Sequence, residues 1–232
     1  MIKSGHPSTN ETQVAAAIAE QVSALEVLNT PNVRKIRQRY SRQLANADPE
    51  VMVALAQQLI HGYGHRALAY ELLAHHPEAF QSLNATKLEA LGRGINSWSS
   101  VDSFARTLAG PAWLHGLVRD ETIHRWAHSP DRWWRRAALA STVALNTRTQ
   151  GGYGDTDRTL AICRLLAADG DDMVYKALSW ALRALVVHDP AAVEAFIEEH
   201  RGQLHARVVR EVHNKLVTGL KNPPGGLQSR QR

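Results

Sequence analysis

Apolar residues recur at steps of three and four along most of the chain, which is the spacing of one face of a helix. Val33, Ile36, Tyr40 and Leu44 show this pattern after Pro31, a residue suited to the first turn of a helix. Alternating Val, Ile and Thr runs bounded by hairpin turns, which would indicate strands, are absent from the sequence. The pattern therefore predicts an all-α fold with no sheet.

Start signals for helices precede many of the apolar segments, at Asp120, Ser129, Asp155, Asp171 and Asp189. The pairs of helices recur at about 35–45 residues, which is typical of a HEAT-like repeat α-solenoid built from stacked antiparallel helix pairs. An irregular globular α-bundle is the alternative. A solenoid would bend into a concave face that collects side chains from separate helices. The ranges expected to be helical are 10–29, 31–44, 48–60, 65–75, 77–82, 85–94, 99–109, 111–118, 120–128, 131–146, 155–169, 171–188, 190–201 and 205–220.

The length of 232 residues fits one sizeable domain or one solenoid. We expect a single domain over residues 1–221, with a flexible N-terminus at 1–9 and a disordered basic tail at 222–232. The longest connection without a helical pattern, at 147–154, is expected to be a mobile loop.

Charge favours an acidic partner, because 27 Lys and Arg residues face 22 Asp and Glu residues, for a net charge of +5. Nucleic acid is one such partner, and the concave face would then be basic. A soluble protein with a mildly basic surface is the plainer interpretation.

The single cysteine, Cys163, excludes an intramolecular disulfide and a thiolate-rich metal site, and its apolar neighbours predict a small core residue. There is no apolar N-terminal run and no uninterrupted apolar span of about 20 residues, so we expect neither a signal sequence nor a membrane helix. The expected location is the cytoplasm, in a bacterium near the nucleoid.

The 12 histidines raise the possibility of a metal site, which their spacing does not support. His61 and His65 are four residues apart, but Gly62 and Gly64 interrupt the helix between them and no Glu follows His61. The other close histidine pairs lack a third ligand at a recognisable spacing. Phosphate-binding loops, dinucleotide fingerprints and nucleophile elbows are also absent, so we expect no metal and no cofactor.

Trp98 and Asp102 are four residues apart and share one face if their segment is helical. One interpretation is structural, with Trp98 packed under the preceding turn and Asp102 helping to cap the helix. The functional interpretation is a carboxylate partly enclosed by an indole, which can stabilise a cationic transition state or orient a water.

The segment from Trp133 to Arg136 is both aromatic and basic. On a helix Arg132 and Arg136 share a face, whereas Arg135 and Arg136 point about 100° apart and cannot do the same job. One of them can pair with a carboxylate, and Arg136 can also be an internal strut between neighbouring repeats.

Lys176, Trp180 and Arg183 lie at i, i+4 and i+7, on one helical face. An exposed indole between two cations fits contact with nucleic acid, with the cations on phosphates and the ring against a sugar or base. Trp180 as an ordinary core residue is the alternative. A further polar stripe on the last helix is either phosphate-facing or solvated, and it comprises Arg207, Arg210, Asn214 and Lys221.

Taken in order, these pieces resemble the AlkD-like family of DNA alkylation repair glycosylases. The resemblance runs from about Asn96 to Lys215, through Trp98–Asp102, Trp133–Ala138 and Lys176–Arg183, and the chain before it shares only the helix pattern. Members of that family are HEAT-like repeat enzymes that remove cationic N3- and N7-alkylated purines from duplex DNA. The resemblance therefore implies a monofunctional alkylpurine DNA glycosylase acting on double-stranded DNA.

By position, the resemblance places the catalytic carboxylate at Asp102, the active-site tryptophans at Trp98 and Trp180, and the active-site arginine at Arg136. Ser99 stands where many members have an acidic residue. The resemblance requires no metal and no cofactor. DNA contacts are expected from Arg135, Lys176, Arg183, Arg210 and Lys215.

Two other functions remain open. In one, a non-catalytic HEAT-like protein binds damaged or distorted DNA, and Asp102 and Arg136 form a structural pair. In the other, the chain is a protein-binding scaffold, which would leave the basic face without a use. For each of the three functions we expect the protein to be a monomer.

Overall fold

Every regular element that the structure describes is helical, which confirms the all-α prediction. The structure is a computed structural model, and it describes residues 9–224. Most of the predicted flexible N-terminus and basic tail, at 1–8 and 225–232, lies outside the described residues. The chain divides into two compact units, with the boundary between Ile95 and Asn96. That residues 1–221 form a single domain stays a prediction.

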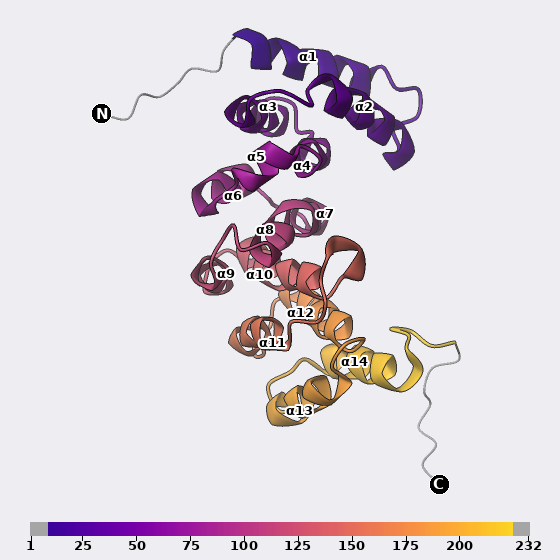
Figure 1. Cartoon of the computed structure of the whole chain (residues 1–232). Helices are drawn as coiled ribbons and strands as arrows, with labels where there is room; N and C mark the ends of the chain where they lie inside the picture. Colours follow the sequence, from indigo (N-terminus) through magenta and orange to yellow (C-terminus); the bar gives the residue numbers. More distant parts are fainter. Residues whose placement is uncertain (1–8, 225–232) are drawn as a thin grey trace. The chain divides into compact units, whose positions relative to one another are not determined.

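The first unit is organised around α3, which packs against α1, α4, α5 and α6 (Figure 1). Its core is aliphatic, and Leu55, Leu59, Leu72 and Leu73 are almost fully buried. The helices of this unit are α1 (Thr9–Ser23), α2 (Thr30–Gln43), α3 (Pro49–His61), α4 (Arg66–Ala74), α5 (Pro77–Gln81) and α6 (Ala85–Gly92).

The first helix ends earlier than its apolar pattern predicts, at Ser23 instead of near Asn29. Asn29 is the N-cap of α2: its backbone is extended and its side chain accepts a hydrogen bond from the N–H of Asn32. The Asn32 side chain in turn donates to the carbonyl of Val27. A residue that caps the next helix cannot also continue the previous one.

In the second unit, helices α10, α12 and α14 follow one another in a row, and α9, α11 and α13 form a second row beside it (Figure 1). Helix α10 lies at its centre and packs against α7, α8, α9, α11 and α12. All residues of α10 from Arg136 to Leu145 are buried. The helices are α7 (Trp98–Phe104), α8 (Gly110–Leu114), α9 (Asp120–Ala127), α10 (Arg132–Leu145), α11 (Thr156–Leu165), α12 (Asp172–Leu185), α13 (Pro190–His200) and α14 (Ala206–Thr218).

Small residues allow α8 to approach α10 closely. A Cβ atom at Gly110 would lie 2.6 Å from the carbonyl oxygen of Ser141 and 2.7 Å from the Cβ of Ala144. Real Cβ atoms do not approach neighbours so closely, so this crossing requires glycine.

The two helices predicted at 99–109 and 111–118 form one continuous run, joined by the π-turn η1 (Ala105–Ala109). In this wider turn the N–H of Gly110 donates to the carbonyl of Ala105. Pro111, the next residue, has no N–H to donate. The carbonyl of Arg106 accepts its hydrogen bond from outside the helix, from Nε2 of Gln150 at 2.7 Å. The sequence reveals Pro111 but not the wider turn, so it predicts a break instead.

Three of the predicted start signals are confirmed, because Asp155, Asp171 and Asp189 are N-caps whose side chains accept backbone hydrogen bonds. Two are wrong as caps. Asp120 is the first residue of α9 and accepts a hydrogen bond from Nε1 of Trp113 at 2.7 Å. Helix α10 is capped by Asp131, two residues after the predicted Ser129.

Candidate functional site

Helix α7 carries the first two candidate residues and begins with a capping box. The Ser97 side chain accepts a hydrogen bond from the N–H of Ser100, and the Ser100 side chain accepts one from the N–H of Ser97. Ser97 therefore caps this helix and Asp102 does not. The Trp98 side chain is not packed away, because 60% of its residue surface is exposed. Neither side chain is therefore used to begin the helix.

Asp102 forms a two-pronged ion pair with Arg136 of α10. Nε of Arg136 lies 2.8 Å from Oδ1 of Asp102, and Nη2 lies 2.8 Å from Oδ2. The third nitrogen, Nη1, donates to the carbonyl of Met173 at 2.6 Å. The Arg136 side chain is 8% exposed and that of Asp102 is 19% exposed. Arg136 thus joins three helices and fixes the orientation of the carboxylate.

The adjacent arginine has different partners, as the helical spacing predicts. Nε of Arg135 lies 2.7 Å from Oδ2 of Asp169, and Nη1 donates to the carbonyls of Ser129 and Pro130. Trp134 packs with Phe104 and Trp126 in an aromatic cluster. Arg135 and Arg136 therefore do not act as a unit.

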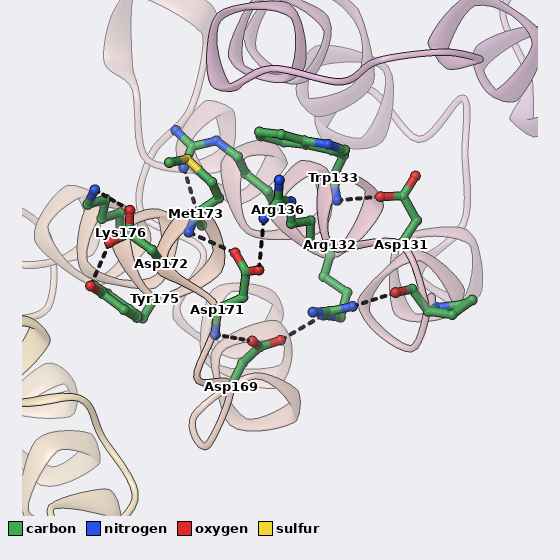
Figure 2. A network of polar contacts seen from close by, with 12 residues as sticks. Asp131, Arg132, Trp133, Arg136, Asp169, Asp171, Asp172, Met173, Tyr175 and Lys176 are labelled. Carbon is green, nitrogen blue, oxygen red and sulfur yellow. Dashed lines mark hydrogen bonds and ion pairs between the residues drawn. The ribbon is translucent and has the colours of Figure 1, made fainter.

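The carbonyl that Arg136 contacts is positioned by a chain of acidic caps before α12 (Figure 2). The N–H of Met173 donates to Oδ1 of Asp171 at 2.8 Å, and the N–H of Asp171 donates to Oδ1 of Asp169 at 2.9 Å. Arg132 adds an ion pair to Asp171 at 3.4 Å. The start of α12 is thereby tied to the start of α10.

An open groove of about 540 Å³ runs along this face of the second unit. We call it the Trp98 groove. None of the described residues that line it is acidic, and five are basic. The lining residues are Trp98, Arg136, Met173, Lys176, Trp180, Arg183, Arg207 and Lys221.

Carboxylates behind the lining hold these cations in place. Glu211 of α14 is almost fully buried, and its Oε1 atom lies 2.7 Å from Nε of Arg207 and 3.5 Å from Nζ of Lys221. Its Oε2 atom accepts a hydrogen bond from Ser179 at 2.7 Å and lies 4.0 Å from Nε of Arg183. One carboxylate therefore anchors three cations of the groove.

Burial and charge oppose each other at this cluster. Burial alone would raise the pKa of Glu211, but the hydrogen bonds from Ser179 and Arg207, with the charges of Lys221 and Arg207, outweigh it and lower the pKa. Burial lowers the pKa of Arg183, and the nearby Glu211 carboxylate offsets part of that effect. Glu211 is thus an ionised carboxylate held under a positive surface.

The structure brings together most of the residues that the sequence singled out. Lys176, Trp180 and Arg183 share one face of α12 as predicted, and all three line the Trp98 groove with Trp98 and Arg136. Asp102 does not itself line the groove, but it is paired with Arg136, which does. Three predicted DNA contacts lie outside the lining: Arg135, Arg210 and Lys215.

Two basic lining residues are not among the DNA contacts that the sequence predicts: Arg207 and Lys221. The sequence places both in a polar stripe that is either phosphate-facing or solvated. The available signal is the spacing of Arg207 and Glu211, which at i and i+4 form an ion pair on one helical face. Lys221 lies beyond the end of α14 and no spacing rule places it.

Other features of the second unit bear on the chemistry. Cys163 is fully buried in α11, as predicted for a core residue, and burial raises the pKa of its thiol. Residues 9–224 contain no group of three or more His, Cys, Asp and Glu side chains arranged to hold a metal ion. In the same part of the chain, no helix has the length and apolar character to cross a membrane.

The comparisons with known proteins identify the family of this chain. Neither a curated protein nor a solved structure matches the chain. The model of one family, described as DNA alkylation repair enzyme, matches residues 7–216, which is most of the chain. Members of this family have the HEAT-like α-solenoid fold that the helix spacing predicts. The chain belongs to the DNA alkylation repair enzyme family.

Proposed function

We propose that the protein is a DNA glycosylase that hydrolyses the N-glycosidic bond of cationic N3- and N7-alkylated purines in duplex DNA. The observation that carries this proposal is the groove in which Trp98 and Trp180 lie among five cations, with the Asp102 carboxylate held behind Arg136. Cations suit the phosphates of DNA, and a carboxylate with indole faces suits a positively charged sugar and base.

The ion pair leaves Asp102 with capacity for catalysis. An ionised carboxylate has about four lone-pair sites, and Arg136 occupies one on each oxygen. The remaining sites can accept a water or face a developing positive charge. Because Arg136 fixes the carboxylate in advance, little reorganisation is needed when that charge develops.

The reaction itself needs little from the protein. An alkylated purine is already cationic, so the bond from C1′ to its nitrogen breaks with the electron pair leaving on a base that becomes neutral. The sugar gains oxocarbenium character, which Asp102 stabilises, and water attacks C1′. The proton of that water passes to Asp102 or to solvent. The faces of Trp98 and Trp180 hold the electropositive sugar and base.

DNA is held by the cations of the groove in this proposal. Arg136 uses three of its five N–H groups on Asp102 and Met173, so two remain for a phosphate. Lys176 and Arg183 contact the backbone from α12. Arg135, Arg210 and Lys215 stay proposed contacts outside the groove.

A second candidate function is non-catalytic binding of damaged or distorted DNA. The observation that favours it is that the ion pair between Asp102 and Arg136 is mostly buried, as expected for a pair that only connects neighbouring helices. The two candidates share the DNA groove and differ in whether Asp102 acts on the substrate.

The distinguishing experiment is single-turnover release of 7-methylguanine and 3-methyladenine from methylated duplex DNA. Asp102→Asn should release at least about tenfold more slowly, which corresponds to about 1.4 kcal/mol of barrier, with DNA binding largely kept. The matched control is Asp157→Asn, which removes an exposed carboxylate on α11 and should not change the rate. Wild-type protein that releases no alkylated base would contradict the glycosylase proposal, and retained salt-dependent DNA binding would then support the second candidate.

A further inference from the structure

A second pocket lies beside Trp180 and has no role in the function proposed above. Its volume is about 430 Å³, and its lining includes Arg106, Arg148, Trp180 and His188. We call it the Arg106 pocket. Trp180 also lines the Trp98 groove, so the indole is a wall that the two sites share. The second pocket therefore adjoins the candidate active site.

Arg106 lies in the π-turn η1 and lines this pocket. Arg106 follows Asp102 by four residues, as Asp102 follows Trp98, so the three occupy neighbouring positions on one side of the helix. The Arg106 guanidinium carbon lies 5.7 Å from the centre of the Trp180 ring, within the range of a cation–π contact.

The same turn anchors the loop that carries Arg148. The side chain of Gln150 donates a hydrogen bond to the carbonyl of Arg106. Gln150 and Arg148 belong to the same 3₁₀ turn, η2 (Arg148–Gln150). At its other end the loop lies against the end of α10: the N–H of Gly154 donates to the carbonyl of Leu145 at 3.1 Å. A Cβ atom at Gly152 would lie 2.2 Å from the carbonyl oxygen of Ala144, so this close approach requires glycine. The predicted mobile loop at 147–154 thus contains fixed points that place Arg148 at the pocket.

The charges of this pocket differ from those of the Trp98 groove. Lys176, Arg183 and Arg207 are each near a carboxylate, Asp172 or Glu211. Within residues 9–224, neither Arg106 nor Arg148 has an ion pair, and no acidic residue lines their pocket. Two arginines without a carboxylate partner in one pocket have their charge available for an anion.

We propose that Arg106 and Arg148 bind a backbone phosphate of the DNA beside Trp180, next to the nucleotide held in the Trp98 groove. This inference rests on the proposed function in so far as DNA is the ligand. His188 also lines the pocket, and its Nε2 lies 3.0 Å from the carbonyl of Asn146, which fixes its ring at the edge of the pocket. Trp180 then stands between two binding sites, with a sugar or base over the ring and a phosphate beyond it.

The test measures binding of undamaged duplex DNA by fluorescence anisotropy at several salt concentrations. Each phosphate contact contributes about 0.9 to the slope of log affinity against log salt. The double variant Arg106→Ala with Arg148→Ala should lower that slope by about 0.9, which is the share of one phosphate, and weaken binding about eightfold at 0.1 M salt. Arg106→Ala and Arg148→Ala should each account for part of this loss. The matched control is Arg164→Ala, which removes an exposed arginine of α11 and should leave slope and affinity unchanged.

The outcomes separate this proposal from the glycosylase proposal. An unchanged salt slope in the double variant would overturn the phosphate site. This holds even if binding becomes weaker, because a loss of affinity without a change in slope would come from a shift of Trp180 and not from a lost phosphate contact. A reduced slope together with release of methylated bases by the wild type supports both proposals. A reduced slope without any release by the wild type supports the phosphate site and contradicts the glycosylase. Urea denaturation of each variant shows whether it is folded.

Discussion

Removing Arg136 should reveal how much the ion pair with Asp102 stabilises the second unit. Arg136→Ala leaves a carboxylate that is only 19% exposed without its partner, and it also removes the side-chain donor to the Met173 carbonyl. Breaking a buried pair from one side costs about 3–5 kcal/mol, and the partial exposure of Asp102 places the expected loss near the lower limit, at about 3 kcal/mol. Asp102→Ala should cost a similar amount, because it leaves the buried guanidinium unpaired.

Urea denaturation followed by tryptophan fluorescence measures this loss selectively, because all six tryptophans follow Asn96 and lie in the second unit. The double variant Arg136→Ala with Asp102→Ala should lose about 2 kcal/mol less than the sum of the single losses. A loss below about 1 kcal/mol for Arg136→Ala, with additive single effects, would show that the pair behaves as a surface ion pair. Arg136 would then not hold the Asp102 carboxylate in a fixed orientation before the substrate binds.

Two further predictions concern stability. Because the pKa of Glu211 is lowered in the folded protein, its ionised form stabilises the fold. This stabilisation is fully present above the ordinary glutamate pKa and is lost as the pH falls through the lowered pKa. Glu211→Gln should therefore destabilise the protein by about 1–3 kcal/mol at neutral pH and make urea stability less dependent on pH below about 4.5; equal acid dependence in both proteins would refute this. Gly110→Ala should cost about 1–3 kcal/mol through its clash with Ser141 and Ala144, whereas Gly170→Ala, with open space around it, should cost little in the same urea assay.

The sequence is most informative where a single helix decides the arrangement. Lys176, Trp180 and Arg183 share a face because helical spacing alone determines it, and the structure places them in one groove. The divergence of Arg135 and Arg136 follows from the same geometry. The local sequence also predicts the caps Asp155, Asp171 and Asp189, but it fails at Asp120, whose carboxylate accepts a hydrogen bond from Trp113 instead.

Arrangements that depend on packing between helices were not predictable in the same way. The contact between Arg136 and the Met173 carbonyl joins residues 37 positions apart, and no spacing rule indicates it. The sequence does not single out Arg106, because its contact with Gln150 joins a wider helical turn to a loop 44 residues later. The roles of Asp102 and Trp98 in catalysis come from the family resemblance and stay predictions.

The hydrogen bond from Gln150 to the carbonyl of Arg106 has an evolutionary consequence. Pro111 removes a backbone donor from the helix, and the side-chain amide of Gln150 serves the carbonyl that is left. Positions 111 and 150 are therefore expected to co-vary, although they are distant in the sequence. A relative that replaces this proline regains a helical donor, and its loop is then released to change in length and composition. Variation at one position should accompany variation at the other across the family.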